Sequence, residues 1–161
     1  MRLIRLRVIN TVENEVIRDI KFNESGLSLI VDETDSSTSG SNIGKTTAVK
    51  VIDLCLGAKS ATSLYREKDT GENSIVKDFI ESNKVIAELY VNINEKEHIL
   101  KKPLYYKGKC KIDDDIFDNV NQYTEALNNL IFKNKNNKPS FRQLITKFIR
   151  LENSNENSLL K

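Results

Sequence analysis

Residues 27–57 decide the expected fold, and they read LSLIVDETDSSTSGSNIGKTTAVKVIDLCLG. The stretch begins with the short apolar run LSLIV, which is typical of a strand buried in a sheet, and continues into a polar loop of small residues. From Lys45 onward, apolar residues recur at helical spacing as far as Leu56, and Gly57 follows as a suitable terminator. We therefore expect a buried strand, a glycine-bearing loop and an amphipathic helix, in that order.

The end of this loop, Gly44-Lys45-Thr46, carries the parts of a phosphate-binding site. Such a site needs backbone N–H groups directed into a concavity, a glycine where the chain passes close to the phosphate oxygens, and a lysine that brings charge to the outer phosphates. The tripeptide alone is a weak signal, because average residue usage produces it by chance in about one chain in ten of this length. The strand before it and the helix after it make phosphate binding the favoured interpretation over a helix that simply begins at a glycine.

We expect the cofactors ATP and Mg²⁺ at this loop. The hydroxyl of Thr46 is the expected magnesium ligand, and Thr47 is expected near the α-phosphate. The residues expected to bind the cofactor are Asn42, Ile43, Gly44, Lys45, Thr46 and Thr47.

The loop departs from the full pattern G-x-x-x-x-G-K-[ST] at one position. Ser39 stands where the pattern has its first glycine, and Gly40 comes one residue later. The departure affects the expected path of the loop and its nucleotide affinity, while the lysine and the hydroxyl remain in place.

The remaining pattern predicts an α/β fold in which a mixed sheet with a β-meander is flanked by helices. Strands are expected at residues 2–9, 16–22, 85–93, 97–104 and 109–112, with turns at Asn14-Glu15 and at residues 94–96. One or two helical turns are expected at residues 74–80, and a full helix at 120–132. Ser140 is expected to cap a last helix, whose apolar residues Phe141, Leu144, Ile145, Phe148 and Ile149 lie on one face.

Composition indicates a folded chain with no membrane partner and a cytoplasmic location. The 161 residues are 39% hydrophobic, and no apolar run approaches the roughly eighteen residues needed to span a bilayer. Cys55 and Cys110 lie far apart without a histidine at metal-ligand spacing, so both are expected to be buried as small apolar side chains. His98 is given no role. Lys plus Arg, 25, exceed Asp plus Glu, 23, by only 2, which neither demands nor excludes a nucleic-acid partner.

The chain resembles the N-terminal half of an ATPase head of the structural-maintenance-of-chromosomes (SMC) and RecF/RecN type, the coiled-coil ABC ATPases. It looks closest to a poorly characterised bacterial SMC-like group associated with DNA processing or defence. The residues that carry the resemblance are Arg2-Leu3-Ile4, Gly26 to Val31, Ser41 to Thr47, Ile52 to Gly57, Phe141 to Ile145 and Phe148-Ile149-Arg150. The Leu56-Gly57 ending of the helix is more specific than the lysine motif itself.

The resemblance implies that residues 1–151 are the N-terminal lobe of a P-loop NTPase head, and that residues 152–161 are a polar linker toward a coiled coil. It implies two partners, the C-terminal half of the head and a second head bound by dimerisation. The sequence has no run of four apolar residues followed by Asp-Glu and no Leu-Ser-Gly-Gly-like stretch, so the chain is expected to be a fragment that is inactive alone. The catalytic residue is therefore not assigned.

The same family carries a glutamine that reaches magnesium and its water. Gln143 is the best candidate by order along the chain, for both cofactor and metal binding, and Gln122 is its rival. A glutamine that only faces solvent on an amphipathic helix is an equally good interpretation. Arg66, which follows the helix, is more simply explained as a solvated side chain than as a phosphate ligand.

Three functions fit these observations. The first is an ATP-driven head that acts on DNA or on a protein partner, and the second is a nucleotide-gated interaction module without turnover. The third is a plain nucleic-acid-binding domain, which a charge run of this kind supports only weakly. The basic residues in question are Lys101, Lys102, Lys107, Lys109 and Lys111 in the predicted hairpins, and Lys133, Lys135, Lys138, Arg142, Lys147 and Arg150 near the last helix.

Overall fold

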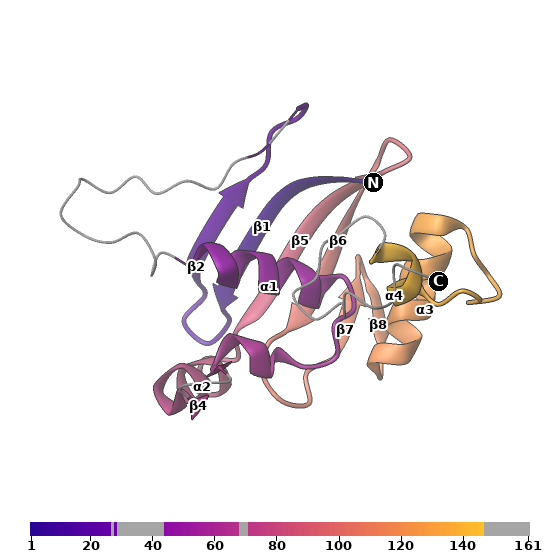
Figure 1. The fold of residues 1–161 in the computed structure, drawn as a ribbon. Helices are drawn as coiled ribbons and strands as arrows, with labels where there is room; N and C mark the ends of the chain where they lie inside the picture. Colours follow the sequence, from indigo (N-terminus) through magenta and orange to yellow (C-terminus); the bar gives the residue numbers. More distant parts are fainter. Residues whose placement is uncertain (27, 29–43, 68–70, 147–161) are drawn as a thin grey trace.

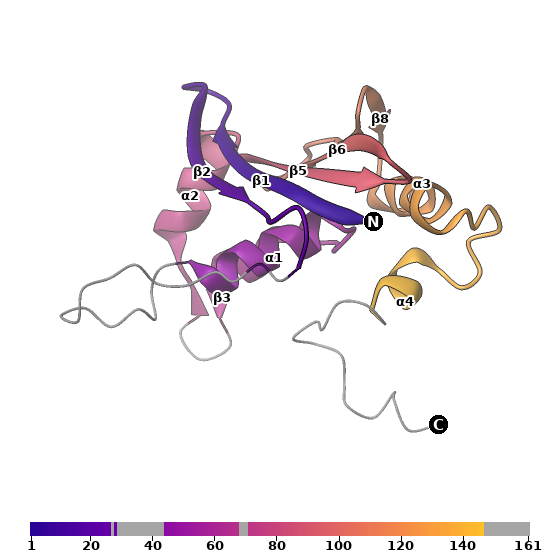
Figure 2. The ribbon, with the colours of Figure 1, turned by 90° about the horizontal axis from the view of Figure 1, so that it is seen from above.

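The computed structural model describes residues 1–26, 28, 44–67 and 71–146. These residues form a mixed α/β fold in which a six-stranded antiparallel sheet is packed against helices (Figures 1 and 2). Helix α1 (Lys45–Cys55) lies across one face of this sheet, and α3 (Val120–Phe132) packs against the strands at one end. The α/β class is thus confirmed.

The strands of the sheet follow the order β2-β1-β5-β6-β7-β8, and every pair is antiparallel. Their bounds are β1 Arg2–Asn10, β2 Glu15–Lys21, β5 Ile86–Ile93, β6 Lys96–Pro103, β7 Cys110–Ile112 and β8 Asp115–Phe117. The predicted meander is therefore present as β5 to β8, with β8 as a short strand that the sequence did not indicate. The expected mixed sheet is antiparallel throughout the described residues, and the buried strand expected at residues 27–31 lies outside them apart from Ser28.

Two turns show why the strands end where they do. Asn94 and Glu95 join β5 to β6 with φ of 50° and 65°, the left-handed pair that matches the twist of a two-residue hairpin. Asp113 has φ of 53° in the turn between β7 and β8, so the acidic run that begins there makes a turn. The first hairpin turn occupies residues 11–14, slightly earlier than expected, because the Asn10 side chain accepts the backbone N–H groups of Val12 and Glu13.

Three of the α-helices follow a residue whose polar side chain accepts a backbone N–H group of the first turn. Asn73 caps α2 (Ser74–Ser82), Asn119 caps α3, and Ser140 caps α4 (Phe141–Ile145). The bounds of α3 and the cap at Ser140 match the sequence prediction. Between α1 and α2, the described residues form the short 3-10 helix η2 (Ala61–Leu64) and the small hairpin of β3 (Arg66–Glu67) with β4 (Gly71–Glu72).

The core lies between the inner face of the sheet and helices α1 and α3. Helix α1 contributes Ala48, Val51, Leu54 and Cys55, and α3 contributes Tyr123 and Leu127. The two helices are also joined by a buried hydrogen bond of 2.6 Å, in which the Tyr123 hydroxyl donates to the Cys55 carbonyl oxygen. Cys55 and Cys110 are free and buried, as expected, and burial raises the pKa of both thiols.

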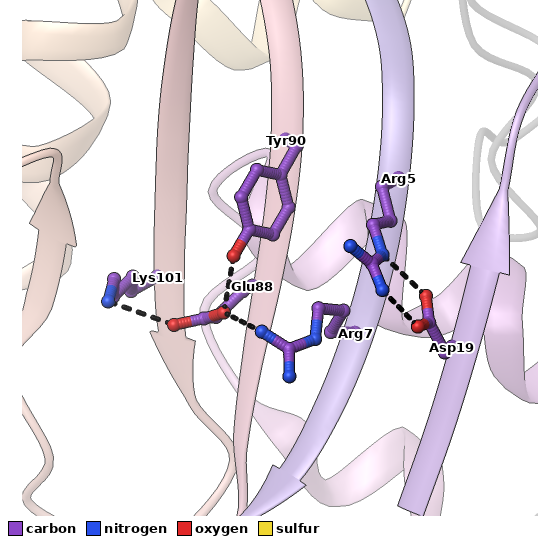
Figure 3. Close-up of polar contacts among 6 residues, drawn as sticks. All are labelled: Arg5, Arg7, Asp19, Glu88, Tyr90 and Lys101. Carbon is purple, nitrogen blue, oxygen red and sulfur yellow. Dashed lines mark hydrogen bonds and ion pairs between the residues drawn. The ribbon is translucent and has the colours of Figure 1, made fainter. Parts of the chain in front are cut away.

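The outer face of the sheet is polar and is tied together by ion pairs across the strands (Figure 3). Glu88 on β5 is buried under its neighbours, and its carboxylate contacts Lys101 at 2.8 Å and Arg7 at 3.5 Å. The Tyr90 hydroxyl donates to the same carboxylate at 2.9 Å, and Arg5 of β1 pairs with Asp19 of β2. Burial alone would raise the pKa of Glu88, but the contacts with Lys101, Tyr90 and Arg7 outweigh it and hold the pKa below its usual range.

Replacing Glu88 by Gln is expected to lower the free energy of unfolding at pH 7 by about 1 kcal/mol, because two cations lose their shared carboxylate. A carboxyl whose folded-state pKa is depressed contributes stability above its unfolded pKa and loses it as the pH falls through the folded pKa. The gap between Glu88→Gln and the parent should therefore shrink below about pH 4. Urea unfolding of both proteins at several pH values measures it, and a gap independent of pH would contradict the ion-pair explanation.

Candidate functional site

The first turn of α1 carries the residues that were expected to bind phosphate. Gly44 precedes it in the left-handed region, with φ of 76° and ψ of 17°, and its carbonyl oxygen accepts the Ala48 N–H at 2.8 Å. In contrast to α2, α3 and α4, no side chain of the described residues caps this helix. Its first N–H groups lack partners within the helix, as in any α-helix, and together with the helix dipole they favour an anion.

The structure places four of the predicted cofactor-binding residues together. Gly44, Lys45, Thr46 and Thr47 follow one another at the start of α1, with Gly44 and Lys45 half-buried and both threonines exposed. Asn42 and Ile43 lie outside the described residues. Lys45 and Thr46 are thus both carried on the first turn of α1.

A cavity of about 240 Å³ opens beside this turn. Its walls are apolar side chains of β1, β2, α1 and α2, together with Val85, Leu64 and Leu104. Gly44 and Thr47, at the start of α1, belong to its lining. Arg18 of β2 also lines it, and its guanidinium Nη2 atom lies 3.9 Å from the position that a Cβ on Gly44 would take.

Gln143, predicted as a magnesium ligand, lies away from this turn. Its side-chain oxygen accepts the backbone N–H of Ser140 at 2.9 Å, which makes it the second half of a capping box at α4. The neighbouring Arg142 pairs with Asp53 at 2.6 Å, and Asp53 follows Lys45 by eight residues, or about 12 Å along the helix axis. The described arrangement therefore does not bring Gln143 to the phosphate end of α1.

The rival Gln122 also serves a helix start. Its side-chain oxygen accepts the backbone N–H of Asp118 at 3.2 Å, just before α3. The capping role of Gln143 could have been predicted from the sequence, because Ser140-Phe141-Arg142-Gln143 has the spacing of a capping box. Arg66 pairs with Glu72 across the small hairpin at 2.9 Å, in keeping with a solvated side chain.

The Leu56-Gly57 segment at the end of α1 is tightly packed against its neighbours. Leu56 is fully buried, and Gly57 has φ of 88°. A Cβ on Gly57 would lie 2.5 Å from the Cγ2 atom of Thr124 on α3, so a side chain does not fit there. The Arg142 guanidinium donates to the Leu56 carbonyl oxygen at 3.1 Å, so α3 and α4 together hold the end of α1 opposite to Lys45.

The basic residues proposed for nucleic-acid binding do not form one free surface. Lys101 pairs with Glu88 and Lys109 with Asp118 at 2.7 Å, while Lys102 is buried on the opposite face of β6. Near the last helix, Arg142 pairs with Asp53, and Lys147 and Arg150 lie outside the described residues. The structure therefore weakens the nucleic-acid interpretation at the hairpins.

His98 is held in place by an acidic side chain of the neighbouring turn. The His98 ring nitrogen Nδ1 lies 2.7 Å from Asp113, and the other oxygen of this carboxylate accepts the Ile99 N–H. The part of the chain that the structure describes contains no group of three or more His, Cys, Asp or Glu side chains that could hold a metal ion.

Comparison with known proteins yields no relative for this chain. Family models, curated sequences and solved structures were each searched without a significant match. Among the described helices, none is long and apolar enough to cross a membrane.

Proposed function

We propose that this chain is the ATP-binding N-terminal lobe of an SMC-like ATPase head, with phosphates bound at the first turn of α1. The observation that carries the proposal is the left-handed Gly44 directly before Lys45 and Thr46, on a helix that no described side chain caps. A left-handed glycine lets the backbone approach phosphate oxygens closely, and the helix start supplies N–H groups and a favourable dipole. Lys45 adds a positive charge, and Thr46 adds a hydroxyl for Mg²⁺.

Packing supports the same assignment. Helix α1 is buried along one face and is held at its far end by Tyr123 and Arg142, so its first turn projects from a fixed helix. Binding sites on fixed elements lose less entropy when a ligand binds. The Leu56-Gly57 ending, which carries much of the resemblance to SMC-like heads, has a packing reason in this chain.

The test is the affinity of the chain for Mg²⁺-ATP before and after Lys45→Ala. We expect the affinity to fall about tenfold or more, because a charge-assisted contact with the outer phosphates is lost. Thermal stability should stay nearly unchanged, since Lys45 lies on the first turn and outside the core. Lys50→Ala, on the same helix, is the matched control and should bind ATP like the parent. Equal binding by Lys45→Ala and the parent would refute the site.

The chain alone is expected not to hydrolyse ATP at a measurable steady rate. Transfer of a phosphoryl group to water needs a group that orients the water and further charges on the leaving phosphate, and a phosphate-binding loop supplies only part of the second. Two described carboxylates that could be considered for this role are otherwise engaged, because Asp53 pairs with Arg142 and Glu13 accepts a hydrogen bond from the Asn10 amide. Phosphate release that disappears in Lys45→Ala would contradict this prediction, and Asp53, Glu13 and Glu33 would then have to be tested as the catalytic carboxylate.

The second candidate is a nucleotide-gated interaction module that binds without turnover. It shares the phosphate site, so binding to this chain does not separate it from an ATPase head. Adding the C-terminal half of the head separates the two candidates, because hydrolysis should appear on complementation only if the full head is an ATPase. DNA binding is the weakest candidate, given that Lys101, Lys102 and Lys109 are paired or buried.

A further inference from the structure

We infer that Lys102 and Cys110 form an oxidisable pair, in which a peroxide oxidises the Cys110 thiol and the Lys102 amine then bonds to the sulfur. The product is a covalent S–N bond between β6 and β7, which makes this pair a modification site inside the core. The reaction needs no nucleotide, so it goes beyond the proposed function.

The two side chains face each other across neighbouring strands. Strands β6 and β7 pair in a register that sets Lys101 opposite Lys111. The next step of the same register brings Lys102 opposite Cys110, and residues opposite each other on one face have Cβ atoms about 5 Å apart. The Lys102 Nζ atom donates to the Cys110 sulfur at 3.6 Å. Because the lysine stem is flexible, the amine can close on the sulfur without a movement of the strands.

The position of Lys102 has no simple structural explanation. Lys102 and Cys110 are each 4% exposed, and within the described part of the chain the sulfur is the hydrogen-bond acceptor of the ammonium, with no carboxylate paired to it. Sulfur is a weak acceptor, so this contact offsets little of the cost of burying a charge. Lysine is almost never fully buried unless it is paired, and such a group calls for an explanation, a redox role among them.

Lys102 also favours the reactive form of its neighbour. The thiolate, rather than the thiol, attacks a peroxide. Burial raises the pKa of Cys110, and the positive charge of Lys102 acts in the opposite direction. Cys55, the other free cysteine, is fully buried, and its sulfur makes no hydrogen bond with a described residue. Peroxide is therefore expected to react first at Cys110.

The first step oxidises the sulfur. The Cys110 sulfur attacks one oxygen of hydrogen peroxide, so an S–O bond forms and the O–O bond breaks. The sulfur gives two electrons to the peroxide, and the departing hydroxide takes the thiol proton and leaves as water. The product at Cys110 is a sulfenic acid.

The second step joins the two side chains without further oxidation. The Lys102 ammonium releases one proton to solvent, and its nitrogen lone pair attacks the sulfur. An S–N bond forms and the S–O bond breaks, while the departing hydroxide takes a second proton from the nitrogen and leaves as water. Sulfenic acids condense with a backbone nitrogen in this way to give a sulfenamide, and an amine is a better nucleophile than an amide.

The cross-linked product should be more stable than the reduced pair. The bond removes a positive charge from the core, because the sulfenamide nitrogen is uncharged. It also ties β6 to β7 across residues 104–109, which restricts the unfolded chain. We expect the oxidised protein to melt about 5 °C above the reduced protein. A thiol reductant should reverse the change, because two thiols become a disulfide and return the hydrogens to Lys102 and Cys110.

The experiment treats the full 161-residue chain with hydrogen peroxide and measures intact mass, a peptide map and the melting temperature, before and after a thiol reductant. The parent should lose the mass of two hydrogen atoms, in linked peptides that contain Lys102 and Cys110. Lys102→Met should instead gain one or more oxygens at Cys110 and show no rise in melting temperature. Lys101→Met is the matched control, because this adjacent lysine lies on the outer face of β6, and it should cross-link like the parent.

Two further variants keep the outcome clear. Cys110→Ala should show no cross-link, which covers the case that Lys102→Met disturbs the sheet, and Cys55→Ala should cross-link like the parent. A disulfide between Cys55 and Cys110 has the same mass as the S–N bond, and its appearance in the peptide map would overturn the inference. Oxygen added to Cys110 of the parent without a link to Lys102 would do so too, as would a parent that stays unmodified under conditions that oxidise the urea-unfolded chain.

Discussion

Replacing Lys102 by Met is expected to raise the free energy of unfolding by about 2 kcal/mol, because Lys102 is a charged residue buried in the core. Lys102 is only 4% exposed, on the inner face of β6 among core residues. Its Nζ atom lies 3.6 Å from the Cys110 sulfur, which is a weak hydrogen-bond acceptor. Met is of similar length and apolar, so it should fill the same space without the cost of burying an ammonium group.

Lys101→Met is the matched control for this experiment. The two lysines are adjacent, but they point to opposite faces of β6, and Lys101 pairs with Glu88 on the outer face. Its replacement should lower stability slightly, by about 0.5 kcal/mol, because the pair is partly exposed. Urea unfolding monitored by circular dichroism gives both values. A destabilised Lys102→Met protein would mean that the ammonium group makes interactions worth more than its burial costs.

Replacing Gly57 by Ala is expected to lower the free energy of unfolding by about 3 kcal/mol, the largest effect that we predict for a single methyl group. Two causes add. The φ of 88° lies in the left-handed region, which costs an alanine about 1 kcal/mol. The new Cβ would also lie 2.5 Å from the Thr124 Cγ2 atom, so α1 and α3 must separate or Thr124 must turn.

A second substitution separates the two causes. Thr124→Ser removes the Cγ2 atom and keeps the hydroxyl that donates to the Asn121 carbonyl oxygen. In the Gly57→Ala background it should restore about 2 kcal/mol, so that only the backbone cost remains. Gly44→Ala is an independent check, since Gly44 has a similar φ of 76° but its nearest neighbour would lie at 3.9 Å. Without ligand it should lose only about 1 kcal/mol. Equal losses at Gly57 and Gly44 would exclude the contact with Thr124 as a cause.

Local sequence patterns were sufficient to predict the positions of the longer helices and strands. The 120–132 helix was predicted with its observed bounds because its apolar residues, Tyr123 and Leu127 among them, repeat at helical spacing, and the structure adds Asn119 as its cap. Residues 94 and 95 joined β5 to β6 as expected. Strand β8 was missed because its three residues become a strand only by pairing with β7, which sequence periodicity does not reveal.

The sequence indicated only the part of the candidate site that is formed by consecutive residues. The start of α1 depends on consecutive residues, and the sequence indicated it. The cavity combines side chains from β1, β2, α1 and α2, so Arg18 could not be assigned to it before the strands were paired. Lys102 was grouped with exposed lysines because lysine is usually solvated, although its alternation with Leu100 places it on the inner face. Gln143 was assigned by order along the chain, which ignored its spacing from Ser140.

The strand order suggests when the nucleotide would act during folding. The β1–β2 hairpin and the β5 to β8 meander each pair strands that are neighbours in sequence, whereas β1 and β5 meet only after residues 22–85 have closed into a loop. Helix α1 belongs to that loop and contacts β5 and β6, so its first turn becomes fixed late, when the two parts have joined. A ligand at Lys45 should therefore stabilise contacts that are absent from the folding transition state. It would slow unfolding and leave the rate of folding nearly unchanged.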